Sequence, residues 1–119
     1  EGSVWEASMS AAHFKLNNLT AILDNNNLQQ TGSNKEIMST QNMANKWKSF
    51  NWDVLEIDGH DISQILNAFR QSSDKPKLIL AKTIKGKGFS FAENNNDWHH
   101  KILTKNQYDE AIKELNDTK

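Results

Sequence analysis

The chain has 119 residues, enough for one small domain with a modest core. Its 14 basic and 15 acidic side chains give a formal net charge of −1, so no basic excess points to nucleic acid as a partner. Cysteine is absent, which excludes a disulfide framework and a zinc-thiolate site, and no apolar run approaches the roughly 20 residues that a membrane-spanning helix needs.

The first part of the chain reads as a helix, a strand and a loop. Residues 3–17 carry apolar side chains near helical spacing, which predicts a helix. Residues 19–23 form a short apolar run ended by polar residues, as in a buried parallel strand. Residues 25–39 are polar and predict a long loop, a type of segment that is often functional or mobile.

A helix and a second strand are expected next. Ser39 or Thr40 is a suitable N-cap for a helix over residues 41–50, because its hydroxyl can accept a hydrogen bond from the first turn. The apolar residues within 52–57 predict the second strand.

The last part of the chain repeats this alternation. Asp61 is a good N-cap for a helix over residues 62–71, which carries an apolar stripe. Residues 77–83 predict a third strand, residues 89–103 look irregular, and residues 105–116 predict a final helix.

This alternation predicts the α/β class, with a parallel sheet and helices on both faces. About three strands and four helices are expected, which is a thin sheet for this class. The sequence shows neither an internal repeat nor a linker, so residues 1–119 are expected to form a single domain.

The polar segment Asp24 to Leu28 is the first candidate site. It offers a carboxylate, three side-chain amides and a backbone carbonyl directly after a buried strand, and such oxygens suit magnesium or calcium. The alternative is a turn whose asparagine side chains bond the local backbone. Asparagine is abundant at residues 25–27 and 94–96, which we assign to composition and loop content.

Two further segments carry groups that suit phosphate chemistry. Residues 85–88 have the sequence Lys-Gly-Lys-Gly, in which glycines allow close approach and lysines offer positive charge. A solvated turn is the alternative interpretation. His99 and His100 follow Trp98, and one of the two histidines could donate a proton or bind a phosphate.

Glu1 and Glu6 lie at the start of the first predicted helix. The helix dipole favours carboxylates at this position, which is one account of them. The other account is a proton-sharing network at a subunit interface, and the sequence leaves both open.

Taken together and in order, five segments resemble the thiamine diphosphate-binding domain of the transketolase family. Residues 1–7 are similar to the stretch after the family's Gly-Asp-Gly signature, and residues 15–28 are similar to the remainder of that cofactor motif. Residues 58–61, 82–88 and 98–101 follow in the family's order and at its approximate spacing. The lysine-containing turn looks more like animal-type and split, two-subunit transketolases than like the yeast form.

The resemblance implies a cofactor and its ligands. The cofactor would be thiamine diphosphate with Mg²⁺ or Ca²⁺, and the metal would be held by the Asn26 side-chain oxygen and the Leu28 backbone carbonyl. Lys85 would lie near the diphosphate. His99 would face the diphosphate and the substrate channel, where it assists proton transfer or binds the donor sugar.

The resemblance also implies roles for the first residues of the chain. Gly2 would belong to the cofactor-binding residues. Glu1 and Glu6 would match the acidic residues that link two active sites across a dimer, and they join His99 as the expected catalytic residues. The implied reaction is transfer of a two-carbon ketol unit from a ketose phosphate to an aldose phosphate, as in the pentose phosphate pathway of the cytoplasm.

Departures from the family pattern bound these expectations. Position 100 is histidine where the pattern usually has glycine, and the Gly-Asp-Gly segment with the third metal ligand is absent. The chain therefore looks like the second half of an incomplete domain, which we expect to be inactive alone. Its expected partner is a pyrimidine-binding domain or a carboxyl-terminal transketolase subunit, in a homodimer or heterotetramer.

Two alternatives are kept. One is another thiamine diphosphate enzyme, such as a dihydroxyacetone synthase or a sugar-modifying transketolase homologue. The other is a non-catalytic interaction module that retains half of the fold. The polar carboxyl end favours the split form of the enzyme.

Overall fold

A computed structural model describes residues 1–117 of the chain. These residues form two compact units, each made of two separate chain segments. The sheet unit comprises Glu1–Asn25 and Thr40–Thr83, and the hairpin unit comprises Asn26–Ser39 and the chain from Ile84 onward. Within residues 1–117, no helix is long and apolar enough to cross a membrane.

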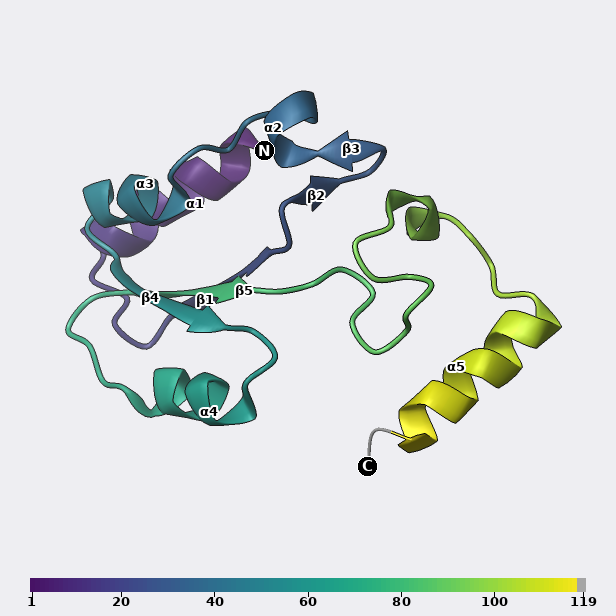
Figure 1. Cartoon of the computed structure of the whole chain (residues 1–119). Coiled ribbons are helices and arrows are strands. Elements are labelled where there is room, and N and C mark those ends of the chain that lie inside the picture. The colour runs from purple at the N-terminus through teal and green to yellow at the C-terminus, as the bar shows by residue number, and fades with distance from the viewer. Residues whose placement is uncertain (118–119) are drawn as a thin grey trace. The chain divides into compact units, whose positions relative to one another are not determined.

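The sheet unit contains a parallel sheet, which confirms the predicted α/β class (Figure 1). Its strands are β1 (Thr20–Asn25), β4 (Asp53–Asp58) and β5 (Lys77–Lys82), and their order is β1-β5-β4. The central strand β5 is buried at its first five residues, whereas the flanking strands are only partly buried. This matches the apolar run that predicted β5, because a central parallel strand is covered on both faces.

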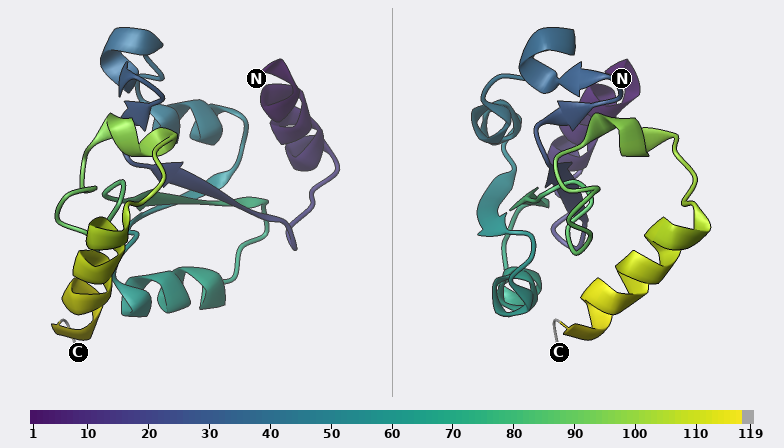
Figure 2. Two further views of the ribbon diagram at one scale, coloured as in Figure 1. Left: turned by 90° about the vertical axis from the view of Figure 1, so that its right-hand side faces the viewer. Right: turned by 45° about the vertical axis from the view of Figure 1, so that its right-hand side comes forward.

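Helices cover both faces of this sheet, as predicted (Figure 1, Figure 2). The helices α1 (Gly2–His13) and α3 (Met43–Ser49) lie on one face, and α4 (Ile62–Arg70) lies on the other. The core beneath α1 and α3 contains the aromatic rings of Trp47 and Trp52, whose centroids are 4.7 Å apart.

The helix α1 is tied to this core by a buried hydrogen bond. The indole N–H of Trp52 donates to the backbone carbonyl of Ser8 at 2.9 Å. The Ser8 hydroxyl in turn donates to the carbonyl of Trp5 at 2.8 Å. Buried polar atoms need such partners, so these bonds hold α1 on the face of the sheet.

The first helix is shorter than predicted, because it ends at His13 rather than near residue 17. The backbone N–H groups of Lys15 and Leu16 donate to the carbonyls of Ala12 and Ala11 at 3.1 and 3.0 Å. This is the Schellman pattern, and Lys15 takes the left-handed conformation that it requires, with φ of 52°. Glycine usually holds that position, and its absence hid the end of the helix.

Two other helix starts differ in how well the sequence located them. Asp61 accepts hydrogen bonds from two backbone N–H groups at the start of α4, which confirms the predicted N-cap. The N-cap of α3 is Asn42, whose side-chain oxygen accepts from the N–H of Asn45 at 3.0 Å. The expected cap at Ser39 or Thr40 is therefore wrong, and an equally good capping residue three positions downstream of Ser39 takes the role.

The segment predicted as a long loop over residues 25–39 is ordered into small elements. The strands β2 (Leu28–Gln29) and β3 (Gly32–Ser33) form an antiparallel hairpin, and α2 (Asn34–Ile37) follows them. A capping box starts α2, in which Ser33 and Glu36 exchange hydrogen bonds. The Ser-x-x-Glu spacing is a sequence signature of a helix start that the loop prediction missed.

The rest of the hairpin unit contains a short 3₁₀-helix and the last helix. The 3₁₀-helix η1 (Asn96–His99) lies within the stretch predicted as irregular, and α5 (Lys105–Asp117) confirms the final predicted helix. Gln107 and Thr104 cap the start of α5, since the Gln107 N–H donates to the Thr104 hydroxyl at 3.3 Å.

Candidate functional site

One pocket in the hairpin unit brings together four of the residues predicted to bind cofactor or metal. It has a volume of about 270 Å³ and is lined by Asn26, Leu28, Gln29, Gln30, Lys85, Asn96 and His99. These residues come from two chain segments separated by more than 50 positions in the sequence. Their arrangement around one cavity is the geometry that a shared ligand requires, and their roles stay predictions.

The turn at Asn26 fixes one wall of this pocket. The Asn26 side-chain oxygen accepts a hydrogen bond from the backbone N–H of Leu28 at 2.9 Å. Asn27 lies between them at φ of 61°, and its carbonyl accepts from the N–H of Asn34 at 2.9 Å. The turn is therefore bonded on both sides, and a second lone pair on the Asn26 oxygen is left for a ligand.

Glycine permits the chain at Lys85 to fold closely. Gly86 has φ of 72°, and a Cβ at this position would lie 2.5 Å from the carbonyl oxygen of Ala92. Only glycine fits such a position without moving the backbone. The carbonyl of Lys85 accepts a hydrogen bond from the N–H of Asn94 at 2.9 Å, which closes the turn and fixes the start of the Lys85 side chain.

His99 is positioned by the short helix η1. The indole N–H of Trp98 donates to the carbonyl of Phe91 at 3.0 Å, and the two rings have centroids 5.0 Å apart. The ring of His99 is exposed and contacts the ring of His100 edge to face, with centroids 4.4 Å apart. Trp98 thus anchors the helix, and the adjacent histidine is left at the pocket.

The other predicted site residues belong to the sheet unit. Gly2 is the first residue of α1, and Glu1 occupies its N-cap position without a side-chain capping bond. Glu6 lies one turn later, and all three residues are exposed. Their carboxylates are therefore accessible at the amino-terminal end of α1.

Sequence reasoning missed three residues of the pocket. Gln29 and Gln30 come from the hairpin that was predicted as loop, and Asn96 was assigned to composition and loop content. No spacing rule in the sequence could select Asn96, because its place depends on how the chain folds between Phe91 and Trp98. A run of asparagines next to a candidate histidine was the only available signal.

The donor atoms of the pocket fit a cation that carries a phosphate group. Among the described residues, no group of three or more His, Cys, Asp or Glu side chains is arranged to hold a metal ion. The pocket instead offers the Asn26 amide oxygen and the Leu28 carbonyl, which are hard oxygen ligands, and the Lys85 ammonium, which suits an anion. In addition, the Asn96 Oδ1 atom is buried without a hydrogen-bond partner.

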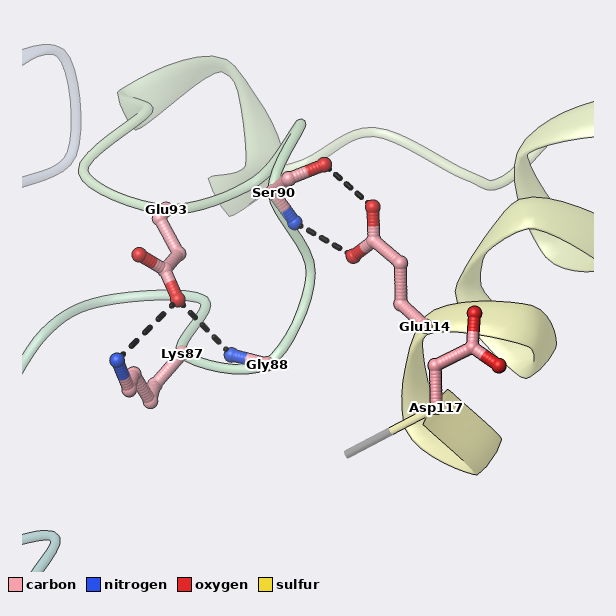
Figure 3. A pocket seen from close by; sticks show the side chains of 6 residues that line it. All are labelled: Lys87, Gly88, Ser90, Glu93, Glu114 and Asp117. Atoms are coloured by element: carbon pink, nitrogen blue, oxygen red, sulfur yellow. Dashed lines mark hydrogen bonds and ion pairs between the residues drawn. The ribbon is translucent and has the colours of Figure 1, made fainter. Parts of the chain in front are cut away.

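A second pocket of about 400 Å³ lies elsewhere in the hairpin unit (Figure 3). Its carboxylates are already bonded to the chain around it. Glu93 accepts from the Gly88 N–H at 3.1 Å and pairs with the Lys87 ammonium at 3.6 Å. Glu114 of α5 accepts from the Ser90 N–H at 2.8 Å and from the Ser90 hydroxyl. These contacts brace the loop after Lys85.

The brace between Ser90 and Glu114 is expected to weaken in acid. Hydrogen bonds from the Ser90 hydroxyl and N–H lower the pKa of Glu114 below its ordinary value. A lowered carboxyl pKa in the folded state stabilises the fold above the ordinary glutamate range, and this stabilisation is lost as the pH falls through the folded-state pKa. Ser90→Ala should raise the Glu114 pKa, as measured by NMR titration of its side-chain carboxyl.

The control for this titration is Ser72→Ala, because Ser72 is an exposed serine of the sheet unit. That variant should leave the Glu114 pKa unchanged. An unchanged Glu114 pKa in Ser90→Ala would show that the two residues do not share these hydrogen bonds in solution.

Comparison with known proteins gives a consistent set of relatives. The family described as "Transketolase, thiamine diphosphate binding domain" matches residues 1–116. One of the two subunits of apulose-4-phosphate transketolase from Phocaeicola vulgatus is 42% identical over 120 residues, which cover 98% of this chain and 43% of that protein. Human transketolase is 38% identical over 115 residues, which cover 97% of this chain and 18% of that protein.

A solved structure shares the fold of the chain. The crystal structure of transketolase from Campylobacter jejuni superposes with a TM-score of 0.91 at 31% identity. The match covers 98% of this chain and 18% of that one. The chain thus spans less than half the length of the relatives that it matches.

Proposed function

Because this chain belongs to the family of transketolase thiamine diphosphate-binding domains, we propose that it forms part of a transketolase. The reaction is the transfer of a two-carbon ketol unit from a ketose phosphate to an aldose phosphate. The observation that carries this proposal is the single pocket lined by Asn26, Leu28, Lys85 and His99. Family membership supports thiamine diphosphate as the cofactor, and the oxygen donors of the pocket support Mg²⁺ or Ca²⁺ beside it.

The pocket residues have distinct roles in this proposal. The side-chain oxygen of Asn26 and the backbone carbonyl of Leu28 hold the metal, and the Lys85 ammonium holds the diphosphate by charge. When bound, the cofactor supplies a thiazolium carbon nucleophile that carries the two-carbon unit. The protein's share is to orient the reacting groups and to exclude water around them.

His99 holds or moves a proton at a hydroxyl group of the donor sugar. Its ring lines the pocket and is exposed, so a substrate can reach it. A positioned histidine is suited to this step because its ordinary pKa lies near physiological pH.

The residues at the start of α1 have roles outside this pocket. Gly2 lies beside the cofactor, and nothing lies within 4 Å of a Cβ at that position. Glu1 and Glu6 connect the two active sites of a dimer through shared protons. Their accessible carboxylates at the end of α1 support this role.

The chain acts together with further protein in this proposal. A pyrimidine-binding domain or a carboxyl-terminal subunit completes the site, and the assembly is a homodimer or heterotetramer of the cytoplasm. The relative from Phocaeicola vulgatus is named as a transketolase subunit, which supports the split form. The chain alone is inactive because the third metal ligand and the pyrimidine-binding domain lie outside it.

A sugar-modifying transketolase is the second candidate. The relative from Phocaeicola vulgatus is named for apulose 4-phosphate, and it is more similar to this chain than human transketolase is. Assays of ketol transfer with apulose 4-phosphate and with xylulose 5-phosphate would separate the two candidates. A preference of at least about 10-fold for either sugar would decide between them.

The variant His99→Ala tests the role of the histidine. In the complete enzyme, turnover should fall by on the order of 100-fold, because a positioned proton donor is removed. The thermal midpoint should change by no more than about 2 °C, because the side chain is exposed. His13→Ala removes an exposed histidine of α1 and should change neither quantity. A large loss of thermal stability with normal activity per folded molecule would make His99 structural.

A further inference from the structure

Asn96 carries an unpaired polar atom next to the proposed cofactor site. Its side-chain oxygen Oδ1 is buried and has no hydrogen-bond partner. The residue lines the same pocket as Asn26, Leu28 and Lys85. Buried acceptors are normally paired, because an unpaired one loses its water without replacement. The atom therefore requires an explanation.

The position of Asn96 is fixed by the residues around it. It is the first residue of η1, and the preceding Asn95 caps this helix by accepting a hydrogen bond from the Asp97 N–H at 3.0 Å. Trp98 anchors the helix to Phe91. The backbone of Asn96 is thus held in place, whereas its amide plane can turn, because the last torsion of asparagine is soft.

The chemistry of the proposed ligand restricts which donor can reach this oxygen. An ionised diphosphate has acceptor oxygens only, so it cannot donate a hydrogen bond to an amide carbonyl. A magnesium ion, in contrast, usually retains several water molecules, and each of these waters donates hydrogen bonds. A water on the cation is therefore the donor that a magnesium diphosphate would bring to this side of the pocket.

We propose that Asn96 is an outer-sphere residue of the cation site, whose Oδ1 accepts a hydrogen bond from a metal-bound water. This inference rests on the proposed function. It adds a binding residue on the η1 side of the pocket to the inner-sphere oxygens of Asn26 and Leu28. The bond orients the water and thereby the cation, as outer-sphere groups do in other metal sites.

The test measures magnesium binding in the complete protein rather than activity alone. Isothermal titration calorimetry follows Mg²⁺ binding at a fixed, saturating concentration of thiamine diphosphate. Asn96→Leu should raise the magnesium dissociation constant by about 10-fold. The thermal midpoint of the variant without ligands should be unchanged or higher, because the substitution removes a buried unpaired acceptor.

Two further variants complete the test. Asn96→Asp keeps an acceptor oxygen and should bind magnesium within about threefold of the parent protein, and it serves if the leucine variant does not fold. Asn106→Leu makes the same substitution at an exposed position of α5 and should change nothing. Together they separate loss of the acceptor from a general effect of replacing asparagine by leucine.

The outcomes are distinguishable. An unchanged magnesium constant in Asn96→Leu would overturn the inference, as would a lower thermal midpoint with normal magnesium binding. A loss of thiamine diphosphate affinity that is equal at all magnesium concentrations would also overturn it, because Asn96 would then act through Lys85. If the parent protein itself binds no thiamine diphosphate with magnesium, the proposed function fails together with the inference.

Discussion

Asn26→Ala in the complete protein is expected to weaken magnesium and thiamine diphosphate binding together, by on the order of 100-fold. The substitution removes an oxygen proposed to bind the metal directly, and the metal in turn holds the diphosphate. It also removes the hydrogen bond from the Leu28 N–H, which positions the second proposed metal ligand. Both losses affect the same cation, so the two affinities should fall in parallel.

The matched control for this experiment is Asn27→Gly. Asn27 is the exposed neighbour of Asn26, does not line the pocket, and has φ of 61°, a conformation that glycine adopts readily. Its substitution should leave both affinities within about twofold of the parent. Unchanged affinities in Asn26→Ala, measured by calorimetry, would argue against the proposed metal site.

Lys77→Met is expected to have the largest effect on stability, a loss of about 2–4 kcal/mol in the free energy of unfolding. Lys77 is 6% exposed, and its ammonium donates to the carbonyls of Ala68, Phe69 and Gln71 at 2.8, 3.2 and 2.8 Å. These carbonyls end α4, where the helix dipole favours a positive charge. Methionine keeps the apolar stem and leaves the three carbonyls without this partner.

Replacing a buried charge by an apolar group can also stabilise a protein when both partners are removed together. Here only one partner is removed, so the cost of the unpaired carbonyls should prevail. Urea unfolding measures the loss, and hydrogen exchange of the α4 amides shows whether it is local. Lys75→Met, an exposed lysine two residues earlier, is the control. A Lys77→Met protein as stable as the parent would contradict this account of the helix end.

The sequence predicted the sheet well because its strands are short apolar runs with clear ends. The run over residues 77–83 corresponds to β5, the strand that is covered on both faces. The end of α1 was missed because a lysine, Lys15, adopts the left-handed conformation that usually marks glycine. The start of α2 was missed although the Ser33 and Glu36 pair is a recognisable capping box.

The site was predicted where chemistry-bearing residues stand in family motifs, and missed where only tertiary structure places them. Asn26, Lys85 and His99 were selected from such motifs, and the structure puts all three around one pocket. Asn96 could not be selected, because it reaches the pocket through the anchoring of Trp98 on Phe91. No linker marks the two compact units, since each is built from two interleaved segments. The expectation of one incomplete domain stays a prediction.

The most direct measurement is a titration of the complete protein, with its pyrimidine-binding partner present, by thiamine diphosphate with and without magnesium. Saturable binding with Mg²⁺ that is lost when the metal is chelated is the predicted result. An intact, folded assembly that ignores thiamine diphosphate at saturating Mg²⁺ would contradict the account, because the oxygens of the Asn26 turn would then hold no cation for a diphosphate.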